Sequence, residues 1–206
     1  MTTHVHKGDL PEGLVFSGSV AIDTETMGLN NVRDKLCLVQ LSSGDGTAHI
    51  VQLDRHTYHA PNLKRLLADP SVLKIFHFAR FDVAVIKHYL GTDTAPLYCT
   101  KIASKLVRTY TDSHGLKSLC EELLGKKISK QCQSSDWGSV QLSKEQIQYA
   151  AADVLYLHQL KAQLDTMLER EGRTMLAQKC FDFIDTRAAL DLAGWPEHDI
   201  FSHEGK

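Results

Sequence analysis

Four carboxylates and one phenol lie in three separate segments of this 206-residue chain, in contexts where they could perform chemistry. The first segment, VAIDTETMGL, has Asp23 and Glu25 two residues apart at the end of an apolar run, so both side chains point to one side of a strand. Asp82 follows a second apolar run, in the first turn of a predicted helix. The segment YAAAD places Tyr149 and Asp153 on one face of a helix.

Each of these patterns has an ordinary structural explanation when it is taken alone. A D-x-E pair at a strand end is most often a solvated edge, an Asp early in a helix favours the helix dipole, and Tyr149 with Asp153 could be a surface contact. Clustered carboxylates repel one another unless cations offset their charge. Taken together, the acids predict a metal site, and a donor set of oxygen atoms suits magnesium or manganese better than zinc.

The composition limits the partners of the protein. Apolar residues make up 43% and charged residues 23% of the chain, and the net charge is −2. These values are typical of a globular domain with one substantial core, which predicts a single domain over residues 1–206. A nearly neutral chain does not coat long nucleic acid by charge alone, so a nucleic-acid substrate would be short or held by local basic groups and metal.

The cysteines and the apolar runs indicate the compartment. The five cysteines are odd in number and contain no C-x-x-C pair, which favours reduced thiols over a disulfide framework or a zinc site. No apolar run approaches the roughly 18 residues of a membrane span, and the start, MTTHVHKGDL, lacks the apolar segment of a signal peptide. We therefore expect a cytoplasmic protein without a membrane partner.

The hydrophobic pattern predicts an α/β fold with a mixed sheet. Runs at 19–24, 35–42 and 47–53 have strand length, and the turn signal Asp45-Gly46 pairs the last two as an antiparallel hairpin. Strands and helices then alternate, with helices expected on both faces of the sheet. The expected later strands are 72–76 and 96–100. The expected helices are a short one opened by Pro61, then 79–91, 101–109, 115–124, 143–170 with the capping box SKEQ, and 173–190, before an irregular tail.

Three motifs resemble a known family. DTETMGL, HFARFD and YAAADVLYL resemble the exonuclease motifs of the DEDD superfamily of 3′–5′ exonucleases, whose fold is ribonuclease H-like. The segments GLKSLCEELLG and KQCQSSDWGSVQLSKEQIQYAAAD resemble its RNase D branch, and the likeness runs from about residue 18 to 165. Gln148 occupies the position of the base in the histidine subtype, whereas Tyr149 fits the tyrosine subtype.

The resemblance implies hydrolysis assisted by two divalent metal ions. In such enzymes the positions matching Asp23, Glu25, Asp82 and Asp153 hold two Mg²⁺ or Mn²⁺ ions at the terminal phosphodiester. Tyr149 would orient the attacking water through its hydroxyl group.

The resemblance also suggests substrate-binding residues. Thr24, Met27, Gly28 and Leu29 match the first-motif segment that meets the terminal nucleotides, where Leu29 resembles an apolar wedge between two bases, as in oligoribonucleases. A core leucine at a strand turn is the alternative.

Further candidates lie near the second and third motifs. His77 could touch the substrate, although a hydrogen-bonded histidine at a strand end is the interpretation we favour. Lys130 and Gln133, in the loop before the third motif, could meet phosphate, although charged loops are usually only solvated. Trp137 more readily anchors this loop than stacks on a base.

The number of residues after the family-like segment points to one branch of the family. About forty residues follow it, too few for a helical RNA-binding domain of the RNase D kind. A catalytic domain by itself resembles the nano-RNase C family, which degrades very short RNAs, dinucleotides above all. That resemblance implies a ring-like homo-oligomer, an octamer. The tail GWPEHDIF, with Trp195 and Phe201, would suit a subunit contact or could fold back on its own core.

The sequence thus predicts a metal-dependent 3′–5′ exoribonuclease acting on short single-stranded RNA. One alternative is a general 3′–5′ exonuclease acting on DNA or longer RNA, since no motif settles the choice of sugar. Another is a non-catalytic nucleic-acid-binding protein, although the complete set of acids with Tyr149 argues against it. The sequence contains neither the G-x-S-x-G motif of serine hydrolases nor the H-E-x-x-H motif of zinc proteases, so it favours neither of these classes.

Overall fold

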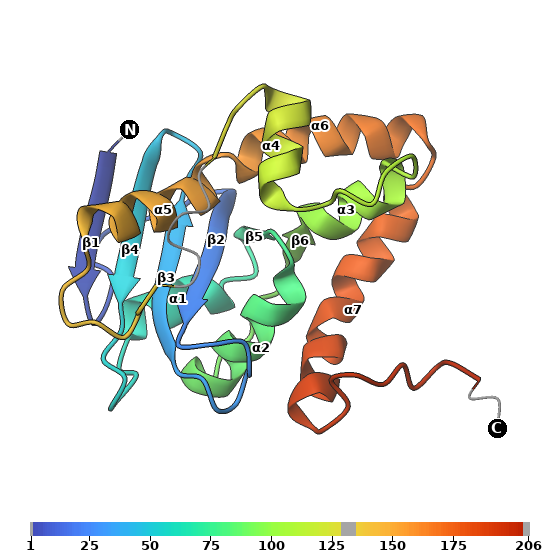
Figure 1. Ribbon diagram of the computed structural model, residues 1–206. Coiled ribbons are helices and arrows are strands. Elements are labelled where there is room, and N and C mark those ends of the chain that lie inside the picture. The colour runs from blue at the N-terminus through green and yellow to red at the C-terminus, as the bar shows by residue number, and fades with distance from the viewer. Residues whose placement is uncertain (1, 129–134, 204–206) are drawn as a thin grey trace.

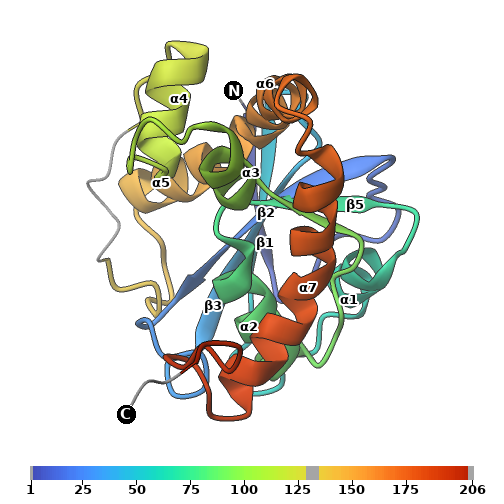
Figure 2. The same ribbon diagram turned by 90° about the vertical axis from the view of Figure 1, so that its right-hand side faces the viewer.

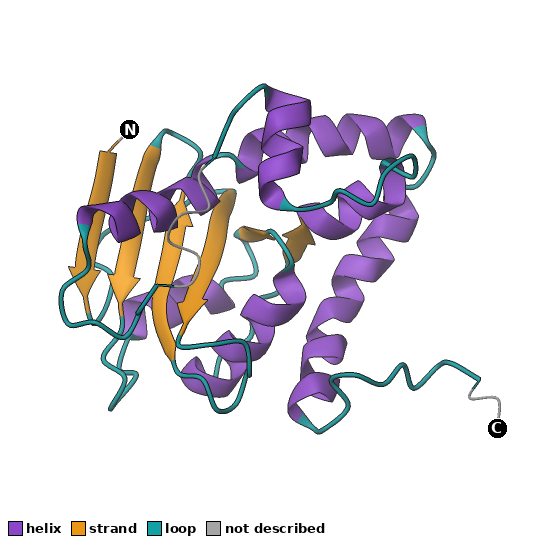
Figure 3. Ribbon diagram, in the orientation of Figure 1, coloured by secondary structure: helices purple, strands orange, loops and turns teal. Residues whose placement is uncertain are grey.

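A six-stranded mixed sheet forms the centre of the molecule, as the computed structural model shows in Figures 1 and 3. The structure describes residues 2–128 and 135–203. Its strand order is β1-β4-β3-β2-β5-β6. The strands are β1 (Thr2–Lys7), β2 (Ser19–Thr26), β3 (Leu36–Ser42), β4 (Thr47–Gln52), β5 (Leu73–Phe76) and β6 (Leu97–Cys99).

Within the described ranges, seven helices accompany the sheet. They are α1 (Pro61–Ala68), α2 (Ala79–Leu90), α3 (Thr100–Val107), α4 (Leu116–Leu124), α5 (Lys144–Leu155), α6 (Leu157–Arg170) and α7 (Thr174–Leu192). In Figure 1, α5 crosses the near face of the strands β1 to β3, and α1 lies behind the sheet. Figure 2 shows α7 running beside α2 and α3, so α7 closes the β6 end of the molecule.

The predicted α/β architecture is confirmed. The strands β2, β3 and β4 are antiparallel, and the turn at Asp45-Gly46 joins β3 and β4. The strands β5 and β6 then run parallel to β2 through βα connections. Every residue of β3 is buried, because this strand lies between two others and is covered on both faces.

Several helices begin or end at the capping residues that the sequence predicts. Gly91 adopts a left-handed conformation and ends α2, since a residue without Cβ takes that conformation without strain. The capping box before α5 is present: the Ser143 hydroxyl accepts from the backbone N–H of Gln146, and the Gln146 side chain accepts from the N–H of Ser143. This box fixes the start of the helix that carries Tyr149 and Asp153.

Two expectations about the elements need correction. Residues 143–170 do not form one helix, because the chain turns at Tyr156, between α5 and α6. The buried stripes differ: Ala150, Ala151 and Val154 of α5 face the sheet, whereas the leucine stripe of α6 packs among α3, α4 and α7. The strand β1 was not expected, because its residues are mostly exposed and polar; it pairs in parallel with β4 at the edge of the sheet.

The C-terminal tail is held through its main chain. The guanidinium of Arg80 pairs with Asp191 at 2.7 Å and donates to the carbonyl of Pro196, and Arg187 donates to the carbonyls of Trp195 and His198. The aromatic side chains of Trp195 and Phe201 are exposed. The main chain of the tail is therefore tied to α2 and α7, while Trp195 and Phe201 stay outside the core, so the expected subunit contact stays a prediction.

The described residues also show whether a helix could span a membrane and whether the cysteines form disulfides. None of the helices in residues 2–128 and 135–203 has both the length and the apolar character that a membrane span needs. The four cysteines within those ranges are free thiols, at positions 37, 99, 120 and 180. This agrees with the reduced cysteines expected from the sequence; Cys132 lies outside the described residues.

Candidate active site

The acidic residues gather where parallel strands end. The strands β2, β5 and β6 are parallel neighbours, so their carboxyl ends share one edge of the sheet, which is where α/β folds bind ligands. Asp23 and Glu25 lie on β2 close to this edge, and the pairing of β2 with β3 shifts register between Glu25 and Thr26. A bulge of this kind bends a strand and redirects its side chains.

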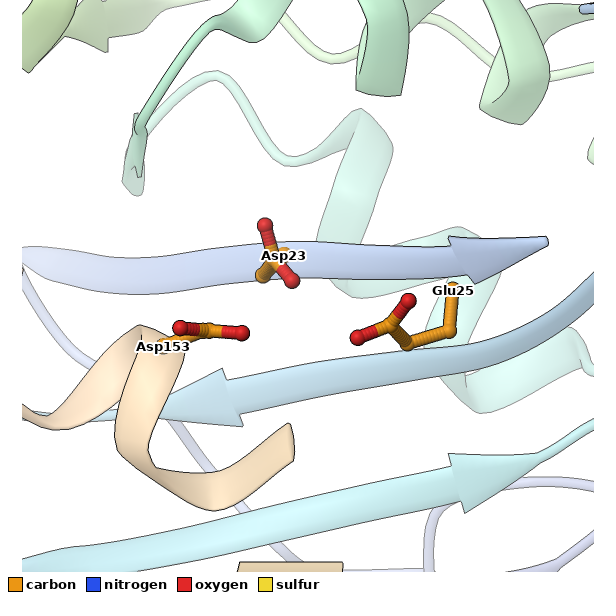
Figure 4. Close-up of side chains that lie close together, drawn as sticks. All are labelled: Asp23, Glu25 and Asp153. Atoms are coloured by element: carbon orange, nitrogen blue, oxygen red, sulfur yellow. The ribbon is translucent and has the colours of Figure 1, made fainter. Parts of the chain in front are cut away.

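Three carboxylates come together as the sequence predicts. One carboxylate oxygen from each of Asp23, Glu25 and Asp153 lies within 4.8 Å of the others. Figure 4 shows Asp153 reaching from α5 toward Glu25, with Asp23 beside them on β2. The i,i+2 spacing in the strand and the position of Asp153 on the sheet-facing helix therefore produce the predicted convergence.

Asp82 is the fourth acid, and it comes from α2. It lies in the first turn of α2, is buried, and accepts a 2.7 Å hydrogen bond from the hydroxyl of Thr24. The charge of Asp82 contributes to the raised pKa of Asp23, and the charge of Asp153 contributes to the raised pKa of Asp82. Thr24, expected near the substrate, therefore uses its hydroxyl group to hold an acid.

Burial and mutual repulsion raise the pKa values of the four acids. Burial, with the charges of Asp82, Asp153 and Glu25, raises the pKa of Asp23 well above its ordinary value. Burial and the neighbouring acids raise the pKa of Glu25 to about 9. Burial raises the pKa of Asp82 to about 7 and that of Asp153 to about 7, against the hydrogen bonds that each accepts. Without a cation, the cluster therefore retains protons near neutral pH.

Tyr149 lies beside the acids. It is half-buried on α5, one turn before Asp153, and burial together with the charge of Asp153 raises the pKa of its hydroxyl. The ring centroid of Trp137 lies 5.9 Å from that of Tyr149. Trp137 is only 3% exposed, packed with Cys37, Leu38 and Ile50, so it anchors its loop as expected.

A cavity of about 700 Å³ opens over the carboxylates. The residues expected at the substrate that line it are Thr24, Met27, Gly28, Leu29 and His77. Leu29 is 88% exposed, so the alternative that it is a core leucine is wrong. A Cβ atom at Gly28 would lie 2.3 Å from Oδ2 of Asp34, so only glycine allows this loop to close as it does.

His77 both borders the cavity and is hydrogen-bonded at a strand end, which are the two arrangements that the sequence left open. It borders the cavity, and its Nδ1 lies 2.8 Å from Oγ1 of Thr100, so the ring is held by a hydrogen bond at the end of β5. Burial and the charge of Lys101 lower its pKa to about 3. The imidazole is therefore neutral at physiological pH. Lys130 and Gln133 lie outside the described residues, and their placement at the substrate stays a prediction.

The cavity includes residues that the sequence analysis missed. Phe78 borders it with a left-handed backbone, an uncommon conformation for a bulky residue that often marks a functional position. The Nζ atom of Lys101, at the start of α3, lies 4.3 Å from the centroid of the Phe78 ring. Lys117 of α4 also lines the cavity. Lys101 follows the carboxyl end of β6, so the rule for parallel strands would have found it.

The residues present fit divalent metal ions. The convergent donors are carboxylate oxygens, which Mg²⁺ and Mn²⁺ prefer. Burial and mutual repulsion raise the pKa values of Asp23 and Glu25, and bound cations would offset that repulsion. Asp23, Glu25 and Asp153 converge closely enough to share an ion, and Asp82, buried next to them, is the fourth acid expected to hold the ions.

Comparison with known proteins places the chain in a family. Residues 8–169 match the 3′–5′ exonuclease family, and the chain belongs to it. Ribonuclease D of Granulibacter bethesdensis is 39% identical over 154 residues, which cover 75% of this chain and 38% of that protein. Ribonuclease D of Escherichia coli is 33% identical over 172 residues, covering 84% of this chain and 45% of that protein. The chain thus spans less than half the length of these relatives.

Solved structures give a likeness over the whole chain. Brucella melitensis NrnC is 58% identical with a TM-score of 0.95, over 99% of this chain and 100% of that one. The same protein bound to pGG aligns with a TM-score of 0.96. It has also been solved with bound Mg²⁺. The resemblance to compact relatives of RNase D is therefore confirmed.

Proposed function

We propose that this protein is a metal-dependent 3′–5′ exoribonuclease that hydrolyses short RNAs, dinucleotides in particular, to nucleoside 5′-monophosphates. The observation that carries the proposal is the convergence of Asp23, Glu25 and Asp153 at the floor of a single cavity. Membership of the 3′–5′ exonuclease family supports the reaction type. The end-to-end likeness to NrnC, which binds pGG, supports a short substrate.

The four acids would hold two divalent ions, Mg²⁺ or Mn²⁺. When bound, such ions lower the pKa of a water molecule and stabilise the charge of the departing 3′-oxygen. Tyr149, beside Asp153, would orient the attacking water by its hydroxyl group, which keeps its proton because its pKa is raised. Thr24 would hold Asp82 in place for this work.

The other walls of the cavity would position the terminal nucleotides. Leu29 is exposed at its rim, where an apolar side chain could insert between two bases. Lys101 and Lys117 would offer positive charge to phosphate. A cavity of about 700 Å³ falls within the range of sites that enclose small ligands, which favours a short substrate over a long one.

We further propose a cytoplasmic homo-oligomer, a ring-like octamer, in which residues 1–206 form one domain. The exposed aromatic groups of Trp195 and Phe201 on the tail support a subunit contact there. Analytical ultracentrifugation of the full chain tests this: an octamer is expected, and a monomer at micromolar concentration would contradict it.

A length series tests the proposed substrate. RNAs from the dinucleotide to the heptamer and longer, each with its DNA counterpart, are incubated with Mg²⁺ or Mn²⁺, and EDTA serves as the metal-free control. We expect the RNA dinucleotide to be cleaved fastest. Stepwise 3′ trimming of long RNA or DNA that leaves dinucleotides behind would instead establish a general 3′–5′ exonuclease, the alternative function.

A further inference from the structure

Three histidines share one face of the sheet at its β1 edge. His4 and His6 are two residues apart in β1, so their side chains point to the same side. The parallel register pairs His4 with His49 of β4, which adds a third imidazole to that face. The ring centroid of His49 lies 5.2 Å from that of His4 and 5.3 Å from that of His6. None of the three lines the cavity over the carboxylates.

Two of these rings already present nitrogen atoms to each other. Nε2 of His6 lies 3.1 Å from Nδ1 of His49. Two nitrogen ligands on one tetrahedral Zn²⁺, with bonds of about 2.0–2.1 Å, lie about 3.3 Å apart. The observed separation is close to this value, although the two nitrogen atoms now share a hydrogen bond; an ion would replace its proton, and both rings would turn so that their lone pairs meet at the ion.

The third ring would join them after a change of rotamer, since its centroid lies 6.3 Å from that of His6 and the three donor atoms do not yet converge. His4 is exposed, so a change of rotamer meets little obstruction, and its backbone pairing with His49 keeps it within reach. His6 and His49 are half-buried, and Phe16 meets the His49 ring edge-on at 5.8 Å between centroids. The cluster therefore has an apolar wall on one side and solvent on the other, which leaves a fourth position for water.

We propose that His4, His6 and His49 form a second metal site, for a borderline transition-metal ion such as Zn²⁺, Ni²⁺ or Cu²⁺. Neutral imidazole nitrogen suits these ions, whereas the carboxylates at the end of β2 and on α5 suit Mg²⁺ and Mn²⁺. The two sites thus differ in donor atoms and in metal preference.

A bound ion would fasten the edge strand to its neighbour. The strand β1 is held by its pairing with β4, and the ends of both strands support the chain that leads into α5. Lys7 donates to the carbonyl of Val140 at 2.9 Å, and Gln52 donates to that of Ser139 at 2.8 Å. Linking β1 to β4 through a metal ion would therefore stabilise the fold at this edge.

Metal titration of the full, untagged chain tests the site. Zn²⁺ affinity is measured by competition with a chromogenic chelator, and Co²⁺ binding by its visible absorption, both in excess Mg²⁺ so that the carboxylates are occupied. We expect one Zn²⁺ ion per chain to bind with micromolar affinity and to raise the melting temperature. His49→Gln and His4→Gln should each weaken binding at least tenfold.

His59→Gln is the matched control, because His59 is exposed and lies outside the cluster. It should bind Zn²⁺ as the parent chain does. His4→Gln changes an exposed side chain, so it keeps the test valid even where His49→Gln disturbs folding. Absence of Zn²⁺ binding in excess Mg²⁺, or equal binding by the parent and the His4→Gln variant, would overturn the proposal. These readouts do not depend on hydrolysis, so they are independent of the proposed function.

Discussion

The hydroxyl of Thr24 donates a 2.7 Å hydrogen bond to Oδ1 of Asp82, across 58 positions of the sequence. This bond ties β2, which carries two of the acids, to the first turn of α2, which carries a third. Hydrogen bonds that orient metal-binding carboxylates commonly affect metal affinity and activity by 10- to 100-fold.

Thr24→Val should therefore weaken the metal site without unfolding the protein. Valine keeps the shape of threonine but removes the donor, so Asp82 is left less well oriented. We expect a roughly 10-fold loss of activity or apparent Mg²⁺ affinity, measured by Mg²⁺ titration of hydrolysis. Thr166→Val, which removes an exposed hydroxyl of α6, is the control. Unchanged Mg²⁺ dependence would show that the bond has no role in positioning Asp82.

Asp153→Asn should abolish hydrolysis while the fold stays intact. Its carboxylate is one of the three that converge, and an amide cannot supply the same negative charge to a metal ion. The metal-free variant should be at least as stable as the parent, because one member of a repelling cluster is removed. Circular dichroism and a hydrolysis assay measure both effects. Turnover at the parental rate would refute the metal assignment.

Tyr149→Phe should lose most of its rate and keep its metal affinity. The substitution leaves the ring against Trp137 and removes only the hydroxyl group beside Asp153. One positioned proton-handling group contributes about 10²-fold, so a loss of that size is expected in kcat. Isothermal titration with Mg²⁺ should give parental affinity. A parental rate would exclude Tyr149 from the mechanism.

Stabilisation by Mg²⁺ should grow as the pH rises from 6 to 9. Folding raises the pKa of Glu25 to about 9 and those of Asp82 and Asp153 to about 7, so the metal-free folded protein holds protons that the unfolded chain has released. The metal-free protein therefore loses stability as the pH rises through these values. Metal binding requires the deprotonated acids, so its stabilising effect increases over the same interval.

Melting curves with Mg²⁺ and with EDTA measure this difference across the pH series. The gap in melting temperature should widen toward pH 9 in the parent chain. In Asp153→Asn it should be small at every pH. A gap that is constant, or largest at pH 6, would contradict the pKa values of the acids.

Leu29→Ala should weaken substrate binding with no effect on stability. The side chain is 88% exposed, so its removal creates no core cavity. If it inserts between bases, its burial contributes about 1.5–3 kcal/mol, and kcat/KM on a dinucleotide should fall at least 10-fold. Val15→Ala, which changes an exposed side chain that does not line the cavity, is the matched control. An unchanged kcat/KM would remove Leu29 from substrate recognition.

The sequence predicted the parts of the fold that short-range rules determine. Alternation gave the shared face of Asp23 and Glu25, and the signals at Ser143 and Gly91 gave the limits of helices. The turn at Tyr156 escaped prediction, because helix periodicity continues on both sides of it and only the packing partners change.

Other features depend on contacts that no local pattern reveals. The strand β1 is mostly polar, and it forms because β4 offers an edge with which it can pair. Lys101 reaches the cavity through the parallel order of β5 and β6, and Thr24 was expected at the substrate rather than at Asp82. Thr24 lines the cavity as expected, and its bond to Asp82 is the additional contact that the sequence did not reveal. These relationships arise from the arrangement of distant segments.

A competition assay tests the proposed function most directly. Equal concentrations of an RNA dinucleotide and an RNA heptamer are incubated together with Mg²⁺ and the parent enzyme, with Asp153→Asn in parallel, and both substrates are followed in the same sample. We predict that the dinucleotide is consumed first, with nucleoside 5′-monophosphates as products and no turnover by the variant. Trimming of the heptamer while dinucleotide accumulates would contradict the proposed function.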